Sequence, residues 1–512
     1  MAPVWLGLDA GTTGVRCLAF DADCTVAASA YVENPPVYSA DGRVEQDPES
    51  WFTASMRVLR TVINEVGADA VQALSISSQG ISVVPVDRTG RPLRNAIIWL
   101  DERGNAVLDE LGALIDKDSV TERSGKPWSG VYTLPKVYWL KRFEPEIFEE
   151  ADAFLQPMDY LHLRLVGEAI TDHTLASASM AYSLRDGTWD RESLGAIGVS
   201  PDLFPTIRDS GSCAGALREP IAAELGIRRI PVRVGGQDQK LAAFGAGIAP
   251  GVATLCLGTS GALESLADSP TFWGGPVFSF LGPGEYVREA AIPTAGAAHR
   301  WYVNNALPGG GYDLSDEMSA TGPSANAPYF FARLSDTSAG KWPTAPGGLF
   351  WGIRLGTDTA DLARSVYEGI AFEIAAWWER MGLYGASLRV FGGGARSAPW
   401  CRIIASTMGC GVERLNMPEA SALGAALLAG LPPVPIASER IRVRDDEIRR
   451  EAERFEEWKE IRDGVYGSPP HANTPGHCRP ETGGAPDLHG PAAGVGRWED
   501  DPRIRPENRQ SR

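Results

Sequence analysis

Histidine is scarce in this 512-residue sequence, and long hydrophobic runs are missing. Three of the six histidines lie near the C-terminus, which leaves His162, His173 and His299 for acid–base chemistry in the rest of the chain. Carboxylates are therefore the expected proton carriers of a catalytic site. No uncharged stretch reaches about 18 apolar residues, the length that a transmembrane helix needs. Residues 4–8 are already strand-like and no basic segment precedes them, so no signal peptide is expected.

Cysteine and basic charge are limited as well. The seven cysteines are odd in number and form no Cys-x-x-Cys pair, which argues against a disulfide framework or a zinc site. The 48 basic residues are outnumbered by 65 acidic ones, so neither nucleic acid nor an anionic membrane has an electrostatic reason to bind the chain. These features together predict a cytoplasmic protein.

The pattern of short apolar runs predicts an α/β protein. The length gives a prior of about two to four domains. Residues 4–8, 17–20, 73–76 and 83–86 are strand-like, whereas residues 47–66 have a helical pattern with Asp47 as N-cap and Pro48 as the first helical residue. Such alternation favours sheets with helices packed on them. Residues 467–512 are rich in Pro and Gly without apolar periodicity, so we expect a disordered tail there.

An internal echo points to a duplicated domain. Leu6-Gly-Leu-Asp-Ala-Gly-Thr-Thr-Gly14 and Thr254-Leu-Cys-Leu-Gly-Thr-Ser-Gly261 are both an apolar strand that runs into a Gly-Thr-Thr/Ser-Gly turn. The echo predicts two related domains whose turns face each other across a cleft, although a match this short also arises by chance.

The first of these turns is a candidate phosphate cradle. In Asp9-Ala-Gly-Thr-Thr-Gly14, a tight glycine turn between two strands directs backbone N–H groups and threonine hydroxyls outward. Asp9 ends a buried strand, where a carboxylate needs a partner, and Mg²⁺ is a suitable one. An ordinary hairpin with a turn-capping aspartate would give the same pattern.

Three later motifs follow predicted strands. In Gly235-Gly-Gln-Asp-Gln-Lys240, Asp238 falls on a strand-to-helix turn, where it suits a general base for a bound hydroxyl or a simple helix N-cap. Phe391-Gly-Gly-Gly-Ala-Arg-Ser397 matches neither common phosphate-loop pattern, and its glycines would let a flat ring lie against the backbone or form a flexible turn. The small residues at 419–429 predict a closely packed helix, most simply a core helix.

In this order, the motifs resemble the FGGY family of carbohydrate kinases, within the actin-like, ribonuclease-H-like ATPase clan. The resemblance covers residues 4–440 and includes the segments Gly42-Arg-Val-Glu-Gln-Asp-Pro48, Trp99-Leu-Asp-Glu-Arg103, Thr171-Asp172 and Tyr367-Glu-Gly-Ile-Ala371. It implies an α/β fold of two duplicated ribonuclease-H-like domains with a cleft between them. The implied division is an N-terminal sugar-binding domain at 1–247, an ATP-binding domain at 248–466 and the tail at 467–512.

The resemblance also implies roles for individual residues. Asp238 matches the catalytic base, which also contacts the sugar, and Asp9 and Asp238 match the Mg²⁺ ligands. The implied nucleotide-binding residues are Gly11, Thr12, Thr13, Gly258, Thr259, Ser260, Gly393, Gly394 and Ala395. The implied sugar-binding residues are Gln79, Gly80, Trp99 and Asp101. The implied cofactors are ATP and Mg²⁺, the partners are a small sugar and ATP without nucleic acid or membrane, and a homodimer is possible.

The expected reaction is ATP-dependent phosphorylation of a sugar hydroxyl, with a ketose such as D-xylulose as acceptor. The chain departs from the family at the sugar loop. Many xylulose kinases of this family carry Gln-Met-His-Gly where this chain has Gln79-Gly-Ile-Ser82, and glycerol kinases carry Arg-Glu after the glutamine. Losing hydrogen-bonding groups costs discrimination for the substrate that needs them, so another sugar or polyol stays open. Residues 333–342 also replace the family's Gly-Glu-Arg-Thr-Pro loop.

Two other functions fit part of the pattern. A polymerising or chaperone-like ATPase of the same clan would not need a base at Asp238 or the sugar-side segment from Trp99 to Arg103. A sugar- or nucleotide-binding regulator that has lost catalysis would not need Asp9, Asp238 and the turn at 258–261. All of these are present, which favours the kinase.

Overall fold

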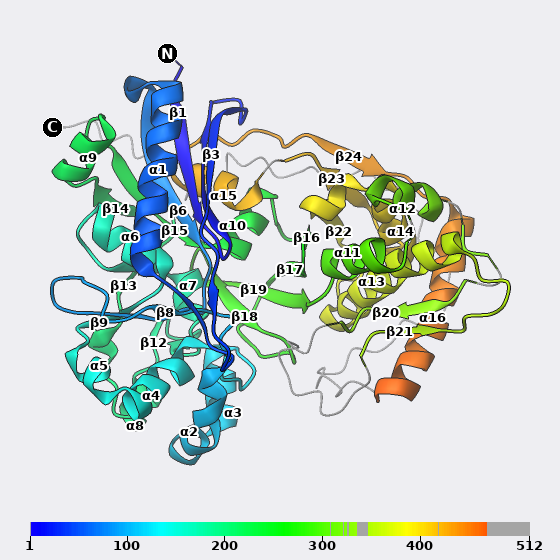
Figure 1. The fold of residues 1–512 in the computed structure, drawn as a ribbon, viewed down its shortest axis with the longest axis horizontal. Helices are drawn as coiled ribbons and strands as arrows, with labels where there is room; N and C mark the ends of the chain where they lie inside the picture. The colour runs from blue at the N-terminus through cyan, green and yellow to red at the C-terminus, as the bar shows by residue number, and fades with distance from the viewer. Residues whose placement is uncertain are drawn as a thin grey trace.

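Two mixed β-sheets of related strand order divide the chain into two lobes (Figure 1). The computed structural model describes residues 2–307, 309–320, 322–324, 327–334, 347–417 and 419–467. The predicted tail beyond Gly467 and most of the loop at 333–342 lie outside the described residues.

The first sheet has the strand order β14-β15-β6-β1-β2-β3. Its strands are β1 (Val4–Ala10), β2 (Gly14–Phe20), β3 (Val26–Glu33), β6 (Val71–Ser78), β14 (Cys213–Ala216) and β15 (Pro231–Gln237). β15, β6 and β1 run parallel, whereas β14, β2 and β3 are antiparallel to their neighbours. The carboxyl ends of the three parallel strands therefore meet at one edge, where the following loops can converge on a ligand.

The second sheet repeats this pattern in the order β18-β19-β17-β16-β22-β23-β24. Its strands are β16 (Val252–Leu257), β17 (Gly261–Ala267), β18 (Val277–Phe280), β19 (Gly282–Ile292), β22 (Ser387–Phe391), β23 (Val412–Leu415) and β24 (Ser438–Ile441). β16 pairs antiparallel with β17 and parallel with β22, as β1 does with β2 and β6. Each predicted Gly-Thr turn joins the first two strands of its sheet, so the predicted duplicated α/β fold is confirmed.

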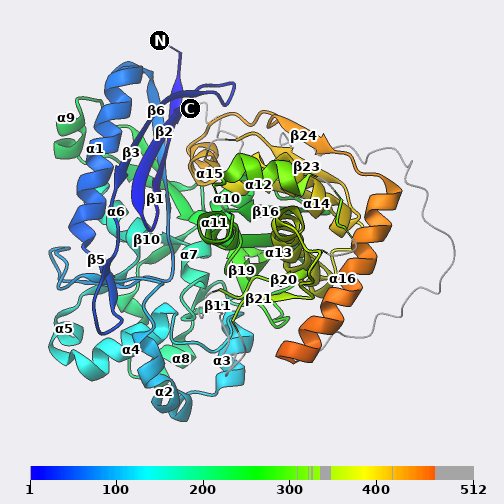
Figure 2. The same ribbon diagram turned by 45° about the vertical axis from the view of Figure 1, so that its right-hand side comes forward.

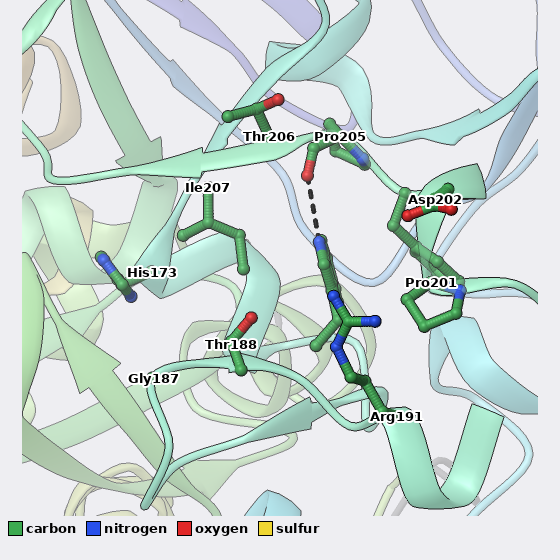
Figure 3. Close-up of a pocket in the computed structure, with 11 residues that line it drawn as sticks. His173, Gly187, Thr188, Arg191, Pro201, Asp202, Pro205, Thr206 and Ile207 are labelled. Atoms are coloured by element: carbon green, nitrogen blue, oxygen red, sulfur yellow. Dashed lines mark hydrogen bonds between the residues drawn. The ribbon is translucent and has the colours of Figure 1, made fainter. Parts of the chain in front are cut away.

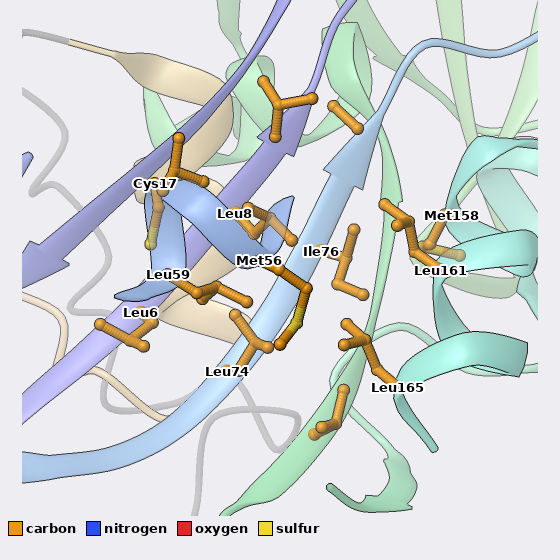
Figure 4. Packing of buried hydrophobic residues seen from close by; sticks show 14 of the residues in the cluster. Leu6, Leu8, Cys17, Met56, Leu59, Leu74, Ile76, Met158, Leu161 and Leu165 are labelled. Carbon is orange, nitrogen blue, oxygen red and sulfur yellow. The ribbon is translucent and has the colours of Figure 1, made fainter. Parts of the chain in front are cut away.

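Helices α1 (Pro48–Val66) and α6 (Pro157–Leu165) pack on the first sheet (Figure 4). α1 begins as the sequence predicts, because the Asp47 carboxylate accepts a hydrogen bond from the Glu49 backbone N–H at 3.0 Å and Pro48 occupies the first turn. Side chains from both helices and both central strands form one buried cluster, which includes Leu6, Leu8, Met56, Leu59, Leu74, Ile76, Leu161 and Leu165. Close packing of this kind fixes where the strands end.

The remaining elements surround these sheets. The first lobe contains α2 (Leu108–Leu114), α3 (Lys117–Ser124), α4 (Thr133–Phe143), α5 (Pro145–Glu150), α7 (His173–Ser177), α8 (Arg191–Ala196) and α9 (Glu219–Leu225). The second contains α11 (Gly296–Asn305), α12 (Tyr312–Ser319), α13 (Thr359–Met381), α14 (Ala398–Met408) and α16 (Asp445–Tyr466). The small sheets are built from β4 (Val37–Tyr38), β5 (Val44–Gln46), β7 (Val84–Val86), β8 (Ala96–Ile97), β9 (Ala153–Leu155), β10 (Ile170–Asp172), β11 (Tyr182–Ser183), β12 (Thr188–Trp189), β13 (Thr206–Arg208), β20 (Tyr329–Phe331) and β21 (Leu349–Trp351). The 3₁₀ helices are η1 (Ala68–Ala70), η2 (Arg103–Val107), η3 (Pro201–Leu203) and η4 (Gly393–Arg396).

Two sequence expectations concern the whole chain. Within the described residues, none of the helices has both the length and the apolar character that crossing a membrane requires. The sequence predicts no disulfide framework, and the cysteines among the described residues are all free.

Helices α10 (Asp238–Gly245) and α15 (Ala420–Leu428) cross where the two lobes meet (Figure 2). A Cβ built on Gly424 would lie 2.0 Å from the Leu241 carbonyl oxygen, and one built on Gly245 would lie 2.4 Å from the Ala420 carbonyl oxygen. Only glycine permits backbones to approach this closely. The small-residue helix predicted at 419–429 is therefore confirmed, and its small residues serve the crossing.

α15 also packs on the first sheet, although it follows the second sheet in the sequence. A Cβ built on Gly7 of β1 would lie 1.9 Å from the Ala422 carbonyl oxygen. The predicted domain boundary at 247/248 falls in the connection between α10 and β16 and stays a prediction. The contacts of α15 mean that the two lobes share a core across that boundary.

Substituting Gly424 with alanine tests the crossing. The added methyl group would meet a backbone carbonyl, which cannot move without displacing α10, so the free energy of unfolding should fall by about 1–3 kcal/mol. Gly464→Ala is the matched control, because a Cβ at that exposed site in α16 meets no atom within 4 Å. Urea denaturation of both variants should show the loss only for Gly424→Ala. Equal stability of the two variants would contradict the close crossing.

Candidate active site

The predicted base and metal ligand meet at the carboxyl edge of β1, β6 and β15. The parallel register aligns Asp9 with Ser77 and Ser77 with Gly236, and Asp238 follows two residues later. Ligands of parallel sheets bind at this edge because the loops that follow the strands converge there. The structure thus brings together two acidic residues that lie far apart in the sequence.

Asp9 is the last but one residue of β1, and its carboxylate has one side-chain hydrogen-bond partner. Its Oδ1 accepts a hydrogen bond from the Ser77 hydroxyl at 2.7 Å. Burial raises the pKa of Asp9 to about 6, although the Ser77 hydrogen bond and the Arg16 charge act in the opposite direction. Arg16 pairs with Asp9 across β1 and β2 and forms an ion pair with Glu419, the N-cap residue of α15. Asp9 is therefore linked electrostatically to the lobe junction.

Asp238 is the first residue of α10, and Gln237 occupies the N-cap position. The simple N-cap interpretation of Asp238 does not hold. One carboxylate oxygen accepts a hydrogen bond from the Gln239 backbone N–H at 2.7 Å. Burial, followed by the negative charge of Asp9, raises the pKa of Asp238 to about 7. A carboxylate with this pKa accepts a proton near neutral pH more readily than an ordinary aspartate does.

The chemistry of this pair fits a divalent cation. Two neighbouring carboxylates repel each other when both are ionised, and a cation between them relieves the repulsion. Carboxylate oxygens suit Mg²⁺, which commonly binds through one or two of them while substrate phosphates and water complete its shell. Within the described part of the chain, no cluster of three or more His, Cys, Asp or Glu could hold a metal ion. The two carboxylates of Asp9 and Asp238 fit a Mg²⁺ ion that binds together with a phosphorylated substrate.

The first glycine turn is held in place from several sides. The Gly11 N–H donates to the Gly14 carbonyl oxygen at 3.0 Å and closes the turn. The Thr12 hydroxyl accepts a hydrogen bond from the indole N–H of Trp99 at 2.9 Å, and the Thr13 carbonyl accepts one from the Asn34 N–H at 2.9 Å. Thr12, a predicted nucleotide-binding residue, thus contacts the predicted sugar-side residue Trp99.

Gln46 connects this turn to the sugar loop, and the sequence analysis gave it no role. Its amide N–H₂ donates to the Thr12 carbonyl oxygen at 2.8 Å, while its amide oxygen accepts from Gln79 at 2.7 Å and from the Trp51 indole at 3.2 Å. The Thr12 hydroxyl lies 3.3 Å from the amide oxygen of Gln79. Gln79 is therefore buried with its amide occupied by protein partners. The sequence signal that could have identified Gln46 is its position in the segment 42–48, which resembles the FGGY family.

Trp99 offers an exposed surface next to the first turn. The side chain is 40% exposed, which is unusual for tryptophan, while its N–H stays bound to Thr12. A fixed aromatic face of this kind can pack against the C–H groups of a sugar. Its predicted role in sugar binding remains a prediction.

Ile81 adopts a backbone conformation that a β-branched residue rarely takes, with φ of 63°. Its N–H donates to the Gln156 amide oxygen at 2.8 Å, and its carbonyl oxygen accepts a hydrogen bond from the Lys136 ammonium at 3.0 Å. The residue is therefore clamped on both sides. Such strain is often found at binding sites, where the surrounding structure stabilises it.

Asp101 is buried, and its carboxylate is occupied by its own protein. It accepts hydrogen bonds from the Val44 N–H at 2.7 Å and from the Arg103 guanidinium at 2.6 and 2.8 Å. Burial alone would raise the pKa of Asp101, but the Arg103 and Val44 hydrogen bonds outweigh it and leave the pKa lowered. In this structure Asp101 fixes the segment after Trp99, and its predicted contact with the sugar remains a prediction.

The second glycine turn is packed against the start of α11. Its Gly258 N–H donates to the Ser260 carbonyl oxygen at 3.0 Å. The Gly258 and Thr259 carbonyl oxygens accept hydrogen bonds from the Gly296 and Ala297 N–H groups, each at 2.9 Å. A Cβ built on Gly296 would lie only 2.5 Å from the Gly258 carbonyl oxygen. The turn is therefore as rigidly held as its counterpart in the first lobe.

The glycine-rich segment after β22 lies beside this second turn. A Cβ built on Gly394 would lie 2.6 Å from the Leu257 side chain, the residue just before Gly258. Gly393 has open space around it, whereas Ala395 is buried. The structure thus brings the two predicted nucleotide segments of the second lobe together, with an open backbone face at Gly393.

A buried lysine joins the base-bearing helix to the second sheet, which the sequence did not suggest. Lys240 is fully buried, forms ion pairs with Glu264 of β17 and Glu289 of β19, and lies 3.9 Å from the ring centre of Phe278 in β18. Buried charges need partners of this kind. Lys240 therefore ties α10, which starts at Asp238, to the hairpin that follows the second turn.

The three histidines considered for acid–base chemistry all have partners elsewhere. His162 contacts the Ile170 carbonyl oxygen at 2.9 Å, and His299 contacts the Ser315 hydroxyl at 3.0 Å. Burial lowers the pKa of both to about 4. His173 contacts Tyr182 and Asp209. None of these contacts involves Asp9 or Asp238, and proton transfer by carboxylates remains a prediction.

A separate hollow of about 390 Å³ in the first lobe shares no residue with the predicted site (Figure 3). It is lined by His173, Gly187, Thr188, Trp189, Arg191, Pro201, Asp202, Phe204, Pro205, Thr206 and Ile207. Two of these lining residues are joined by a hydrogen bond, in which the Trp189 indole N–H donates to the Pro205 carbonyl oxygen at 3.0 Å.

Comparison with known proteins covers both lobes. Residues 4–245 match the N-terminal domain of the FGGY family of carbohydrate kinases, and residues 253–431 match its C-terminal domain. A xylulose kinase of Escherichia coli (strain K12) is 30% identical over 461 residues, which cover 84% of this chain and 90% of that protein. A glycerol kinase of Thermococcus gammatolerans is 29% identical over 441 residues, covering 83% and 88%. The crystal structure of a xylulose kinase from Rhodospirillum rubrum superposes with a TM-score of 0.82 at 24% identity over 90% of this chain and 98% of that one, which supports the same fold.

Replacing Asp238 with asparagine should stabilise the metal-free protein at high pH. The pKa of Asp238 is about 7 in the folded protein and about 3.8 in the unfolded chain. The folded state therefore favours the protonated form of this residue. That stabilising contribution is complete below pH 4 and is lost as the pH rises through 7. At pH 8 in EDTA, Asp238→Asn should exceed the wild type in free energy of unfolding by about 1–3 kcal/mol.

Urea denaturation at pH 4 and pH 8 measures this difference. At pH 4, asparagine and the protonated aspartic acid should give nearly equal stability. Asp69→Asn, an exposed aspartate in η1, serves as the control. A gain of the same size at both pH values would contradict a raised pKa at Asp238.

Proposed function

The chain belongs to the FGGY family of carbohydrate kinases, and from that premise we propose that it transfers the γ-phosphoryl group of ATP to a hydroxyl of a ketose such as D-xylulose. It is a carbohydrate kinase, and the proposal concerns its acceptor and its catalytic residues. The observation that supports the proposal most is the pair of carboxylates, Asp9 and Asp238, at the carboxyl edge of β1, β6 and β15.

Asp238 would act as the general base. Its carboxylate would accept the proton of the attacking sugar hydroxyl as the new oxygen–phosphorus bond forms. Its pKa of about 7 supports this role, because an ordinary aspartate would be a much weaker base at neutral pH. Proton transfer of this kind contributes about 10²–10⁴-fold to a reaction rate.

Phosphoryl transfer otherwise depends on positioning and on neutralising charge. The turns at 11–13 and 258–260 would hold the phosphates through backbone N–H groups, since both are fixed by hydrogen bonds to neighbouring segments. Gly393, Gly394 and Ala395 would lie against the adenosine. A Mg²⁺ ion held by Asp9 and Asp238 supplies charge neutralisation on the phosphates when it is bound.

The choice of a ketose rests on similarity to known kinases, whereas the sugar loop leaves a second candidate open. Xylulose kinases are among the similar proteins, together with glycerol kinases. The sugar would bind between the Trp99 face, the strained loop at 79–82 and Asp238. Gly80 and Ile81 present no polar side chain there, so a kinase for a different sugar or polyol is the second candidate.

ADP release with Mg²⁺ and ATP, measured against a panel of ketoses, aldoses and polyols, tests the proposal. We expect at least one sugar to stimulate turnover strongly, and Asp238→Asn to reduce that stimulation about 10²–10⁴-fold. The Asp69→Asn control should retain full stimulation. Stimulation that survives in Asp238→Asn would show that another group is the base.

A further inference from the structure

Gln237 lies directly before the proposed base, and the amide oxygen of its side chain has no hydrogen-bond partner among the described residues. It is the last residue of β15 and the N-cap of α10. Its backbone N–H donates to the Thr174 hydroxyl at 2.7 Å, which fixes its main chain. The side chain makes no capping hydrogen bond to α10, so its amide does not stabilise the start of the helix.

The amide oxygen of Gln237 is buried without a hydrogen-bond partner among the described residues. The residue is only 7% exposed, so bulk water cannot compensate for the missing partner. Leaving a buried acceptor unsatisfied destabilises a protein by about 1–3 kcal/mol. Such a group, placed beside a catalytic residue, indicates a ligand that supplies the missing donor.

The sugar loop makes room for this side chain. The register of β6 and β15 pairs Ser78 with Gln237, so Gly80 follows two residues beyond that pair. A Cβ built on Gly80 would lie 3.1 Å from Cγ of Gln237. A larger residue at position 80 would therefore press against Gln237. The missing side chain at Gly80 thus leaves the room in which the Gln237 side chain lies.

The other glutamine of the loop cannot take the same role. The amide of Gln79 already donates to Gln46 and contacts Thr12. Gln237 has an amide oxygen without a partner among the described residues, as does Gln239 on the other side of Asp238, and the Cγ of Gln237 borders the position of Gly80 in the sugar loop. A sugar hydroxyl is a suitable partner because it donates one hydrogen bond and can also accept from the amide N–H₂.

We propose that Gln237 determines sugar specificity by binding an acceptor hydroxyl other than the one that is phosphorylated. The proposal rests on the kinase function proposed above and deepens it. The acceptor class is then a polyhydroxylated sugar or polyol that carries a free hydroxyl near the reacting one. An analogue that lacks that hydroxyl leaves the buried amide unpaired and is discriminated against.

Gln237→Met tests the contact, because methionine keeps the length and shape of the side chain and removes the amide. For the best sugar of the panel, kcat/KM should fall about 10–100-fold. The kcat/KM of the wild type should fall by a similar factor with one monodeoxy analogue of that sugar. With this analogue, Gln237→Met and the wild type should have the same kcat/KM. This pattern assigns the contact to one hydroxyl.

Thr254→Val is the matched control. The Thr254 hydroxyl is also buried without a partner in the described residues, but it lies on β16, four residues before the second turn. Valine has the same shape, so sugar discrimination should be unchanged. Equal losses by Gln237→Met on the parent sugar and on every monodeoxy analogue, or no loss at all, would overturn the proposal.

Calorimetric titration of the sugar in the absence of ATP separates this proposal from the kinase proposal. Unchanged sugar affinity in Gln237→Met overturns the contact, whatever the turnover. Weakened affinity in Gln237→Met, with no ADP release by the wild type on adding that sugar, supports the contact and contradicts the proposal that this sugar is the phosphoryl acceptor.

Discussion

The contact on which the structure depends is the backbone-to-backbone crossing of α10 and α15. Gly424 and Gly245 allow the two helices to touch, and Gly7 allows α15 to lie on β1 as well. α10 begins at the proposed base, so any displacement at the crossing would move Asp238 relative to the second lobe. The ion pairs of Lys240 with Glu264 and Glu289 reinforce the same connection. The relative position of the two lobes is thus set by close packing and by buried charge together.

The active-site chemistry follows from the strand order. Parallel strands bring Asp9 and Asp238 to one edge, and burial with mutual repulsion raises the pKa of Asp238 to about 7. This arrangement costs stability at neutral pH, as is common for catalytic groups. The repulsion between the two carboxylates would be relieved by a divalent cation or by a proton. The chain belongs to the FGGY family of carbohydrate kinases, which indicates phosphorylation of a sugar as the reaction.

The sequence predicted much of this and missed the parts that depend on distant contacts. The glycine turns, the duplication, the helix start at Asp47 and the position of Asp238 after a strand all leave local signals. Gln46 and Gln237 lie inside segments that the sequence pointed to, but their individual roles were not predictable, because these depend on contacts with segments far apart in the chain. The interpretation of Asp101 shows the same limit. Its place in a sugar-side segment was visible, but its complete occupation by Arg103 and Val44 was not.

The central claim is that Asp9 and Asp238 form the metal-binding reaction centre at the edge of the first sheet. Crystals grown with ADP and Mn²⁺, a cation that prefers the same oxygen ligands as Mg²⁺, would locate the metal by its anomalous scattering. We expect one strong peak between the two carboxylates and the nucleotide phosphates. A nucleotide bound with its metal held by other residues, and no peak near Asp9 and Asp238, would contradict it.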